Sequence, residues 1–316
     1  GGSGAGAWLS TAPSSEVETF TDGDYCAAVR TRLCQEVSPP GLRCSNTYSS
    51  GARAGEHCAE ALDTKGTHAS TCKVGGGVGR KHNDLVLLLA RLLRAAGYTV
   101  EADGPGTWEP RWDRPVLNRD GSQKRDADGN LLWERARLDL RLEGGPEEPT
   151  TYGDVVVSQA RADSWVRLGA AADGAVAAEA RGRKQRRYPP NEVPGARLVA
   201  FSVEAGGRWD EPALNFLRRA AGRASERHPG LAAMGGAGAS AVFNSWLGQL
   251  SCALQKANVA CLRSASAASR GPAPGVHAEA AEASGPGFSG EGDDWLEEAV
   301  EELLQWAAAN PIAEAF

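Results

Sequence analysis

Between residues 83 and 221 the hydrophobic residues change their spacing several times, and this alternation limits the folds that the chain can adopt. The leucines after Asn83 recur every three to four residues, as on one face of a helix. Short runs rich in valine and leucine follow and predict strands. The predicted elements are a helix at 83–97, strands at 98–101, 136–142 and 152–158, a helix at about 170–188 and a strand at 197–203. This order of helix, strand, strand, strand, helix, strand predicts an α/β fold around one sheet.

The rest of the chain adds flanking regions to this unit. Residues 103–133 are rich in Gly, Pro, Asp and Arg and predict a hairpin that turns near Asp120-Gly121 or Asp128-Gly129. Residues 1–14 are rich in Gly, Ser and Ala, which predicts a mobile start. The predicted domains are an N-terminal helix and small zinc-binding module at 1–79, the α/β domain at 80–225, a helical segment at 226–263, and a linker with an acidic amphipathic helix at 264–316.

The net charge of −6 is unevenly distributed, because ten of the 40 acidic residues lie in residues 271–316, which hold neither Lys nor Arg. The remaining 30 acidic residues face 34 basic ones, so the body of the chain can accept an anionic partner. No segment has the roughly 18 apolar residues of a membrane span, and no secretory signal is seen. We therefore expect an intracellular soluble protein, nuclear or cytoplasmic, without a membrane partner.

Seven cysteines, an odd number scattered over the chain, favour reduced thiols with some metal ligation over a disulfide framework. Four residues with zinc-ligand chemistry lie in a glycine-rich segment without apolar periodicity. They are Cys44, Cys58, His68 and Cys72. A tetrahedral Zn²⁺ site would supply the folding free energy that such a segment lacks. His57 and His82 are rival ligands, and the alternative is a set of free thiols on a flexible loop.

Two aspartates fall inside segments that are otherwise typical of buried strands: Asp139 among leucines, and Asp154 before three valines. A buried carboxylate is costly unless it pairs with a cation or binds a metal ion. If the two strands are neighbours, both carboxylates converge on a divalent cation, which polarises a phosphate and activates water. The alternative is that each aspartate caps a strand end or meets an arginine.

The helix predicted at 170–188 places Lys184 and Tyr188 on one face with Ala177 and Arg181, so Lys184 can point toward the sheet. The end of this helix is also strongly basic, which suits a nucleic-acid backbone. Its arginines are Arg181, Arg183, Arg186 and Arg187. The alternatives are a solvated helix end, cations favoured near a helix C-terminus, and a nuclear-import tract.

Two further places are candidates for the same site. Arg80, Lys81 and His82 lie at the start of the first long helix, where free backbone N–H groups and the helix dipole suit a phosphate. His82 is alternatively a zinc ligand or a packing residue. Glu101, on the first strand, is either an additional carboxylate beside the metal or a solvent-facing strand residue.

Taken in order, these residues resemble the restriction-like endonuclease region, of the PD-(D/E)XK class, that follows reverse transcriptase in some non-long-terminal-repeat retrotransposons. The resemblance covers about residues 4–262 and rests on the order and spacing of short motifs. The motifs are Gly4-Ala-Gly-Ala-Trp-Leu9, Cys58, Leu62-Asp63, Gly66-Thr-His68, Cys72, Lys81-His-Asn83, Glu101, Arg137-Leu-Asp139, Asp154-Val155 and Lys184-Gln-Arg-Arg-Tyr188.

The resemblance implies a restriction-endonuclease-like core that nicks target DNA with Mg²⁺. Asp139 and Asp154 would hold the metal ion, and Lys184 would orient the attacking water or stabilise the developing charge. Tyr188 and the neighbouring arginines would position the strand. The resemblance also implies a structural zinc motif before the nuclease and a reverse transcriptase domain on the same native chain. DNA, and secondly the RNA of the element, would be the partners.

Two positions depart from the family pattern. Val156 stands where the nuclease superfamily usually has its lysine, so the resemblance implies that Lys184 replaces it from the helix. Leu138 stands where a proline usually precedes the first aspartate. Two alternatives therefore accompany the nuclease: an inactive nucleic-acid-binding module of a reverse-transcriptase polyprotein, and a scaffolding protein whose acidic helix binds an unknown protein partner.

Overall fold

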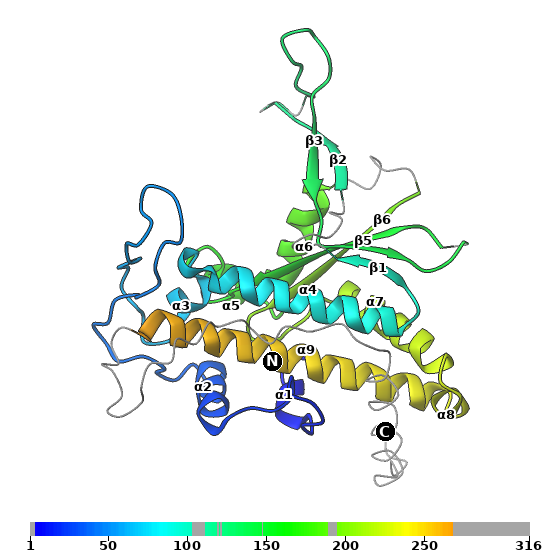
Figure 1. Cartoon of the computed structure of the whole chain (residues 1–316), viewed down its shortest axis with the longest axis horizontal. Helices are drawn as coiled ribbons and strands as arrows, with labels where there is room; N and C mark the ends of the chain where they lie inside the picture. The colour runs from blue at the N-terminus through cyan, green and yellow to red at the C-terminus, as the bar shows by residue number, and fades with distance from the viewer. Residues whose placement is uncertain are drawn as a thin grey trace.

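The computed structural model shows a sheet packed with long helices, from which a hairpin projects (Figure 1). The residues that it describes are 4–102, 111–118, 120, 122–146, 148–188 and 195–267. The predicted acidic helix and the linker from residue 268 on lie outside the described residues, whereas residues 264–266, predicted as the start of the linker, belong to a helix.

The centre of the fold is a four-stranded sheet with the strand order β1-β4-β5-β6. β1 (Thr99–Ala102), β4 (Leu140–Glu143) and β5 (Thr151–Ser158) pair antiparallel, and β6 (Arg197–Glu204) runs parallel to β5. A parallel pair needs a crossover connection, which contains α6 (Ala175–Arg187). This mixed sheet with its helices confirms the predicted α/β class.

The two faces of the sheet are covered by different helices, because successive strand residues point to opposite sides. Val155 points into the main core, which includes residues of α4 (Gly77–Ala95) and α7 (Glu211–Glu226). Ser202 points to the other face, where its hydroxyl donates a 2.7 Å hydrogen bond to the Ala177 carbonyl of α6. Residues of β5 next to Val155 therefore lie under α6.

A 31-residue helix, α9 (Gly236–Ser266), runs beside α4 along the body (Figure 1). Its Trp246 and Leu250 belong to the same core as the sheet. The short helix α8 (Pro229–Ala233) precedes it and packs against α7. The segment predicted at 226–263 therefore packs directly onto the α/β unit.

The start of the chain is ordered from Gly4 on, so the predicted mobility of residues 1–14 is wrong for the part described. α1 (Ala7–Ser10) and α2 (Asp22–Arg32) both pack against α9 (Figure 1). Trp8 is 3% exposed, and its ring lies 5.7 Å from that of Phe20. Burial of this tryptophan therefore orders a segment whose Gly, Ser and Ala content is typical of a flexible chain.

The segment predicted to form a hairpin does so, and it projects from the body (Figure 1). β2 (Arg111–Pro115) pairs antiparallel with β3 (Trp133–Arg137) in a separate two-stranded sheet. Near the tip, Asp126 Oδ1 accepts the backbone N–H groups of Asp128 and Asn130, each at 2.9 Å. The chain also reverses direction around the first predicted place, where Leu117 and Gln123 form an antiparallel bridge, so both predicted turns are confirmed.

Two predicted elements are interrupted in the structure. The strand expected at 136–142 is split at Leu138 and Asp139, because the residues before the split pair in the hairpin and those after it pair in the main sheet. The helix expected at 170–188 is two helices, α5 (Val166–Ala171) and α6, separated where Gly174 takes a left-handed φ of +75°.

The first long helix begins earlier than predicted, at Gly77 rather than near residue 83. α3 (Thr67–Thr71) and the 3₁₀ turn η1 (Val74–Gly76) precede it. The order α4-β1-β4-β5-α6-β6 follows the predicted order of elements. Membership of the PD-(D/E)XK class stays a prediction.

Candidate functional site

Asp154 lies on β5 and is only 3% exposed. Its side chain is on the α6 face of the sheet, because the neighbouring Val155 faces the main core. Lys184 on α6 reaches back to this face, and its Nζ lies 2.6 Å from Asp154 Oδ2. The predicted orientation of Lys184 toward the sheet is confirmed.

Asp139 lies beside Asp154, one residue before the paired positions Leu140 and Gly153. The Asp139 backbone N–H donates to the Gly153 carbonyl at 3.1 Å, and its carboxylate Oδ2 accepts the Val155 backbone N–H at 2.6 Å. The side chain is nearly buried. The two predicted aspartates are therefore brought together where β4 begins.

His82 contacts the same carboxylate oxygen of Asp139. Its Nε2 lies 3.1 Å from Asp139 Oδ2. The hydrogen bond to Asp139 raises the pKa of His82, which favours the charged imidazole. The sequence did not predict this contact, because 57 residues separate the two partners and no local pattern links them.

In this centre two carboxylates lie in contact with a lysine ammonium and an imidazole. Burial raises the pKa of Asp154 to about 6, an effect that the Lys184 charge opposes and the Asp139 charge strengthens. Lys184 Nζ is within ion-pair distance, yet no hydrogen bond of good angle reaches Asp154 Oδ2 within the described part of the chain. A buried carboxylate oxygen with too few partners is costly. Asp154 Oδ2 therefore lacks a well-directed hydrogen bond from the described residues, although the Lys184 ammonium lies 2.6 Å away.

Glu101 and Tyr188, both predicted for the catalytic set, make other contacts. Glu101 pairs with Arg141 at 3.2 Å, in register with it on β4. Tyr188 is 2% exposed and packs edge-on against Trp112 of the hairpin, with ring centroids 6.5 Å apart. Tyr188 thus fixes the base of the hairpin to the end of α6.

The basic end of α6 is partly neutralised. Arg181 is held by the buried Asp210 at 2.5 Å. Arg183 and Arg186 both pair with Glu179, at 3.2 and 2.8 Å, in exposed ion pairs that contribute little and can exchange for phosphates. The exposed basic residues among those predicted to bind nucleic acid are Arg80, Arg183, Arg186 and Arg187.

Lys81 is wrong as a predicted surface contact for nucleic acid, because its side chain is buried. Its Nζ donates to the Ser70 carbonyl at 3.0 Å and to Asn258 Oδ1 at 3.2 Å. The early start of α4 at Gly77 places Lys81 one turn inside the helix, facing α3 and α9. Burial also lowers the pKa of this ammonium.

The four predicted zinc ligands form one cluster whose ligand atoms all lie within 4.8 Å of one another. They are Cys44, Cys58, His68 and Cys72. Two sulfur–sulfur distances are 3.8 Å, and a sulfur lies 3.7 Å from the imidazole Nε2. Sulfurs bound about 2.3 Å from a tetrahedral zinc ion lie about 3.8 Å apart. The cluster can therefore hold a metal ion such as zinc, whereas the rival His57 lies against the Ser45 carbonyl at 3.0 Å.

Local structure explains how these ligands meet. Cys44 and Cys58 lie on facing segments joined by a 2.7 Å hydrogen bond from the Cys58 N–H to the Asn46 carbonyl. The Asp63 carboxylate accepts the N–H of His68 at 2.7 Å and so fixes the start of α3. We call residues 42–74 the Cys–His module. It packs on the end of α9, where the Ser45 N–H donates to the Ala265 carbonyl at 2.9 Å.

Within the part of the chain that the structure describes, no helix is both long and apolar enough to cross a membrane. The sequence matches no known family model and no curated protein. Function is therefore inferred from the geometry of the two clusters.

Proposed function

We propose that the chain is a Mg²⁺-dependent DNA endonuclease whose reaction centre contains Asp139, Asp154 and Lys184. One observation carries this proposal: two nearly buried carboxylates lie side by side, one of them paired with a lysine and short of hydrogen bonds. Carboxylate oxygens placed side by side are the ligands that Mg²⁺ prefers, and a cation between them would lower their mutual repulsion. The resemblance of the sequence to retrotransposon nucleases supports the same chemistry.

The free carboxylate oxygens fit a divalent cation in number and kind. Asp139 uses Oδ2 for the Val155 N–H and for His82, which leaves Oδ1 to a metal ion. Asp154 would contribute Oδ2, which has no well-directed hydrogen bond from the described residues but contacts Lys184 Nζ at 2.6 Å, so the metal ion and the ammonium would share this oxygen. A bound Mg²⁺ would neutralise charge on the scissile phosphate and make a bound water more acidic.

Two side chains beside this position, Lys184 and His82, would contact the substrate and hold a metal ligand in place, respectively. Lys184 is 24% exposed, so substrate can reach an ammonium that already lies beside Asp154. It would donate to a phosphate oxygen as negative charge develops there, or orient the attacking water. His82 is a positioning residue, because its hydrogen bond holds the Asp139 carboxylate in place.

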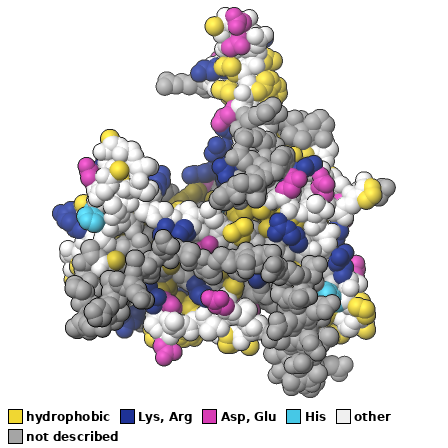
Figure 2. All heavy atoms as spheres, in the orientation of Figure 1, with side chains coloured by type: hydrophobic (Ala, Val, Ile, Leu, Met, Phe, Trp, Pro, Cys, Tyr) yellow, Lys and Arg dark blue, Asp and Glu magenta, His cyan; other side chains and the backbone are white. Residues whose placement is uncertain are grey.

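The surface beside the centre suits a nucleic acid. Exposed arginines of α6 present cations to phosphates, and the hairpin projects from the end of the same helix. The hairpin exposes Leu117, Leu131 and Trp133, which are 57, 43 and 54% exposed, and Figure 2 shows hydrophobic side chains gathered on it. An exposed aromatic ring near basic residues suits contact with bases or a groove.

For the Cys–His module we propose a structural zinc ion. All four ligands come from the protein, so no coordination position is open to a substrate. The apolar core of the module is small, with Leu62 and Ala69 buried beside two of the cysteines. A metal ion would supply the folding free energy that this core lacks and would hold the module on α9.

An inactive nucleic-acid-binding module is the second candidate, because Val156 lacks a side chain that could act at the metal and Lys184 could serve as a purely structural partner of Asp154. A retrotransposon origin, with reverse transcriptase on the same native chain, stays a prediction from the resemblance, as does binding of element RNA.

The test is nicking of supercoiled plasmid in Mg²⁺ or Mn²⁺, with Asp154→Asn and the matched control Asp210→Asn. Both aspartates are buried and paired with a cation of α6, but only Asp154 lies beside Asp139. We expect the first variant to bind DNA in a mobility-shift assay without cutting it, and the second to cut. Wild-type protein that binds and never cuts would instead support the inactive module.

A further inference from the structure

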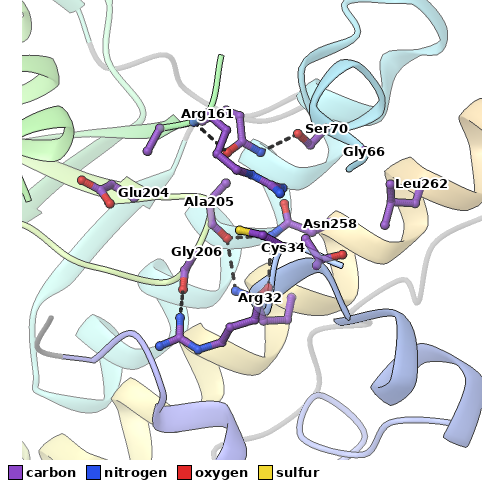
Figure 3. A pocket seen from close by; sticks show the side chains of 14 residues that line it. Arg32, Cys34, Gly66, Ser70, Arg161, Glu204, Ala205, Gly206, Asn258 and Leu262 are labelled. Atoms are coloured by element: carbon purple, nitrogen blue, oxygen red, sulfur yellow. Dashed lines mark hydrogen bonds between the residues drawn. The ribbon is translucent and has the colours of Figure 1, made fainter. Parts of the chain in front are cut away.

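A cavity of about 160 Å³ lies at the carboxyl ends of the parallel strands β5 and β6 (Figure 3). Its walls come from these strand ends, the Cys–His module, α9 and the end of α2. Ser158 ends β5 four residues beyond Asp154, so roughly 13 Å of strand separates this place from the aspartate–lysine centre. Ligands of α/β sheets commonly bind where parallel strands end.

Arg161, just after β5, extends toward the middle of this cavity (Figure 3). Its Nη1 is buried and has no hydrogen-bond partner among the described residues. The segment that carries it is fixed, because Gln159 Oε1 accepts the Arg161 N–H at 3.4 Å and Gln159 Nε2 donates to Ser70 Oγ at 2.7 Å. A buried guanidinium N–H without an acceptor is costly unless a ligand supplies one.

A second guanidinium, that of Arg32, lines the same cavity. Its Nη1 donates to the Gly206 carbonyl at 3.1 Å, and no carboxylate of the described residues forms an ion pair with it. The Lys81 ammonium lies directly behind the wall, where it binds Ser70 and Asn258, two residues that line the cavity. Three cationic groups therefore surround this space.

Among the described residues that line the cavity, Glu204 is the acidic one, and its carboxylate is directed away from the interior. Burial raises the pKa of its carboxyl group, and the backbone N–H groups at the start of α6 and the Arg208 charge oppose this effect. Figure 3 shows the Glu204 side chain pointing away from Arg161. The cavity is therefore positive in its interior.

We propose that this cavity binds a phosphoryl group, either of free phosphate or of a terminal phosphate on a nucleotide. Guanidinium groups match phosphate oxygens in geometry and form charge-assisted hydrogen bonds. A volume of about 160 Å³ equals roughly five water molecules of about 30 Å³ each, enough for a tetrahedral oxyanion with some water. The bound anion would accept a hydrogen bond from Arg161 Nη1, which has no other partner among the described residues. This inference does not depend on the proposed nuclease activity.

The experiment is calorimetric titration of the full chain with inorganic phosphate at low chloride, for wild type, Arg161→Gln and Arg218→Gln. Arg218 is a matched control, because its guanidinium pairs with Glu211 on the surface of α7. We expect Arg161→Gln to weaken phosphate binding by at least about tenfold and Arg218→Gln to leave it unchanged. Equal affinity of all three proteins, or no binding by wild type at millimolar phosphate, would overturn the proposal.

Folding of the variant is checked by thermal unfolding with and without phosphate. Without phosphate, Arg161→Gln should be at least as stable as wild type, since the lost Nη1 has no partner. Phosphate should then raise the unfolding temperature of wild type and of Arg218→Gln but not of Arg161→Gln. If Arg161→Gln proves unstable, Arg32→Gln takes its place, and unchanged phosphate affinity in that variant contradicts the proposal.

Further titrations identify the source of the phosphoryl group. A nucleoside monophosphate that binds more tightly than inorganic phosphate assigns the site to a nucleotide. A preference for a 5′-phosphorylated oligonucleotide over its 5′-hydroxyl form assigns it to a strand end, and equal affinity for all phosphates assigns it to the free anion. Asp154→Asn should bind phosphate like wild type, so loss of nicking and loss of this site are separable.

Discussion

Replacing Asp154 by Asn should make the metal-free protein more stable at neutral and higher pH while abolishing nicking. The Asp154 carboxylate is 3% exposed, and burial, opposed by Lys184 and strengthened by Asp139, raises its pKa to about 6 from the ordinary 3.8. The folded protein therefore keeps a negative charge where its own structure disfavours one. Asparagine retains the size of the side chain and removes that charge.

The direction of this change in stability follows from proton linkage. Because the folded pKa is above the unfolded one, the ionised carboxylate opposes folding fully above about pH 6, and this cost disappears as the pH falls toward 3.8. The cost at pH 8 is about 3 kcal/mol. Lys184 loses an ion pair in the variant but is 24% exposed and can rehydrate. We therefore expect a net gain of about 1 to 2 kcal/mol, or roughly 2 to 8 °C in unfolding temperature.

Urea unfolding with a chelator at pH 8, 6 and 4 measures this gain. It should be largest at pH 8 and small at pH 4. The control Asp210→Asn should instead lose about 1 to 3 kcal/mol, because it leaves the Arg181 guanidinium without its 2.5 Å partner. If Asp154→Asn destabilises the protein as much as Asp210→Asn does, the reasoning is refuted, and the contact of Asp154 with Lys184 is a structural ion pair.

Purified protein should carry about one zinc ion per chain, which native mass spectrometry should find lost from Cys72→Ser and kept by Cys34→Ser, whose cysteine is exposed and outside the cluster. Zinc retained by Cys72→Ser would place the ligands elsewhere. Lys184→Arg should bind DNA nearly as well as wild type and nick it at least about tenfold more slowly, since it keeps the charge but not the compact ammonium. Wild-type nicking rates would remove Lys184 from the centre. Truncation after residue 270 deletes ten carboxylates and should tighten DNA binding at low salt, with a smaller gain at high salt. Unchanged affinity would leave the acidic tail as a segment for a protein partner.

Elements that bury one continuous apolar face could be predicted from the sequence. All but one of the leucines that predicted the first long helix fill the core from α4, the exception being the exposed Leu87, and the valines after Asp154 mark β5. The residues at which helices begin and end were less predictable, because they depend on the backbone conformation of one or two residues. Gly75 and Gly76 take φ values of +77° and +71°, and these turns let α4 begin at Gly77 without any change in composition.

For the Cys–His module, the residue types predicted the metal-ligand cluster better than their spacing along the sequence did. The gap of 13 residues between Cys44 and Cys58 fits no short zinc signature, yet both lie on facing segments that hydrogen bonds join. Contacts between distant segments could not be predicted in this way. The sequence places Lys81 at a helix start, where it suits a phosphate, whereas packing of α4 against α9 buries it beside Asn258. The Arg161 cavity likewise depends on five separate segments.

The split of the predicted strand at 136–142 and the formation of the aspartate centre have the same cause. Regular pairing of β4 with β5 ends at Leu140 and Gly153, so the Val155 N–H on that side lacks a strand carbonyl. The Asp139 carboxylate accepts this N–H at 2.6 Å in place of a backbone group. That bond fixes one oxygen next to Asp154 and leaves the other open. The Asp139 carboxylate thus takes the place of one backbone acceptor, and the apolar pattern of residues 136–142 does not reveal this exchange.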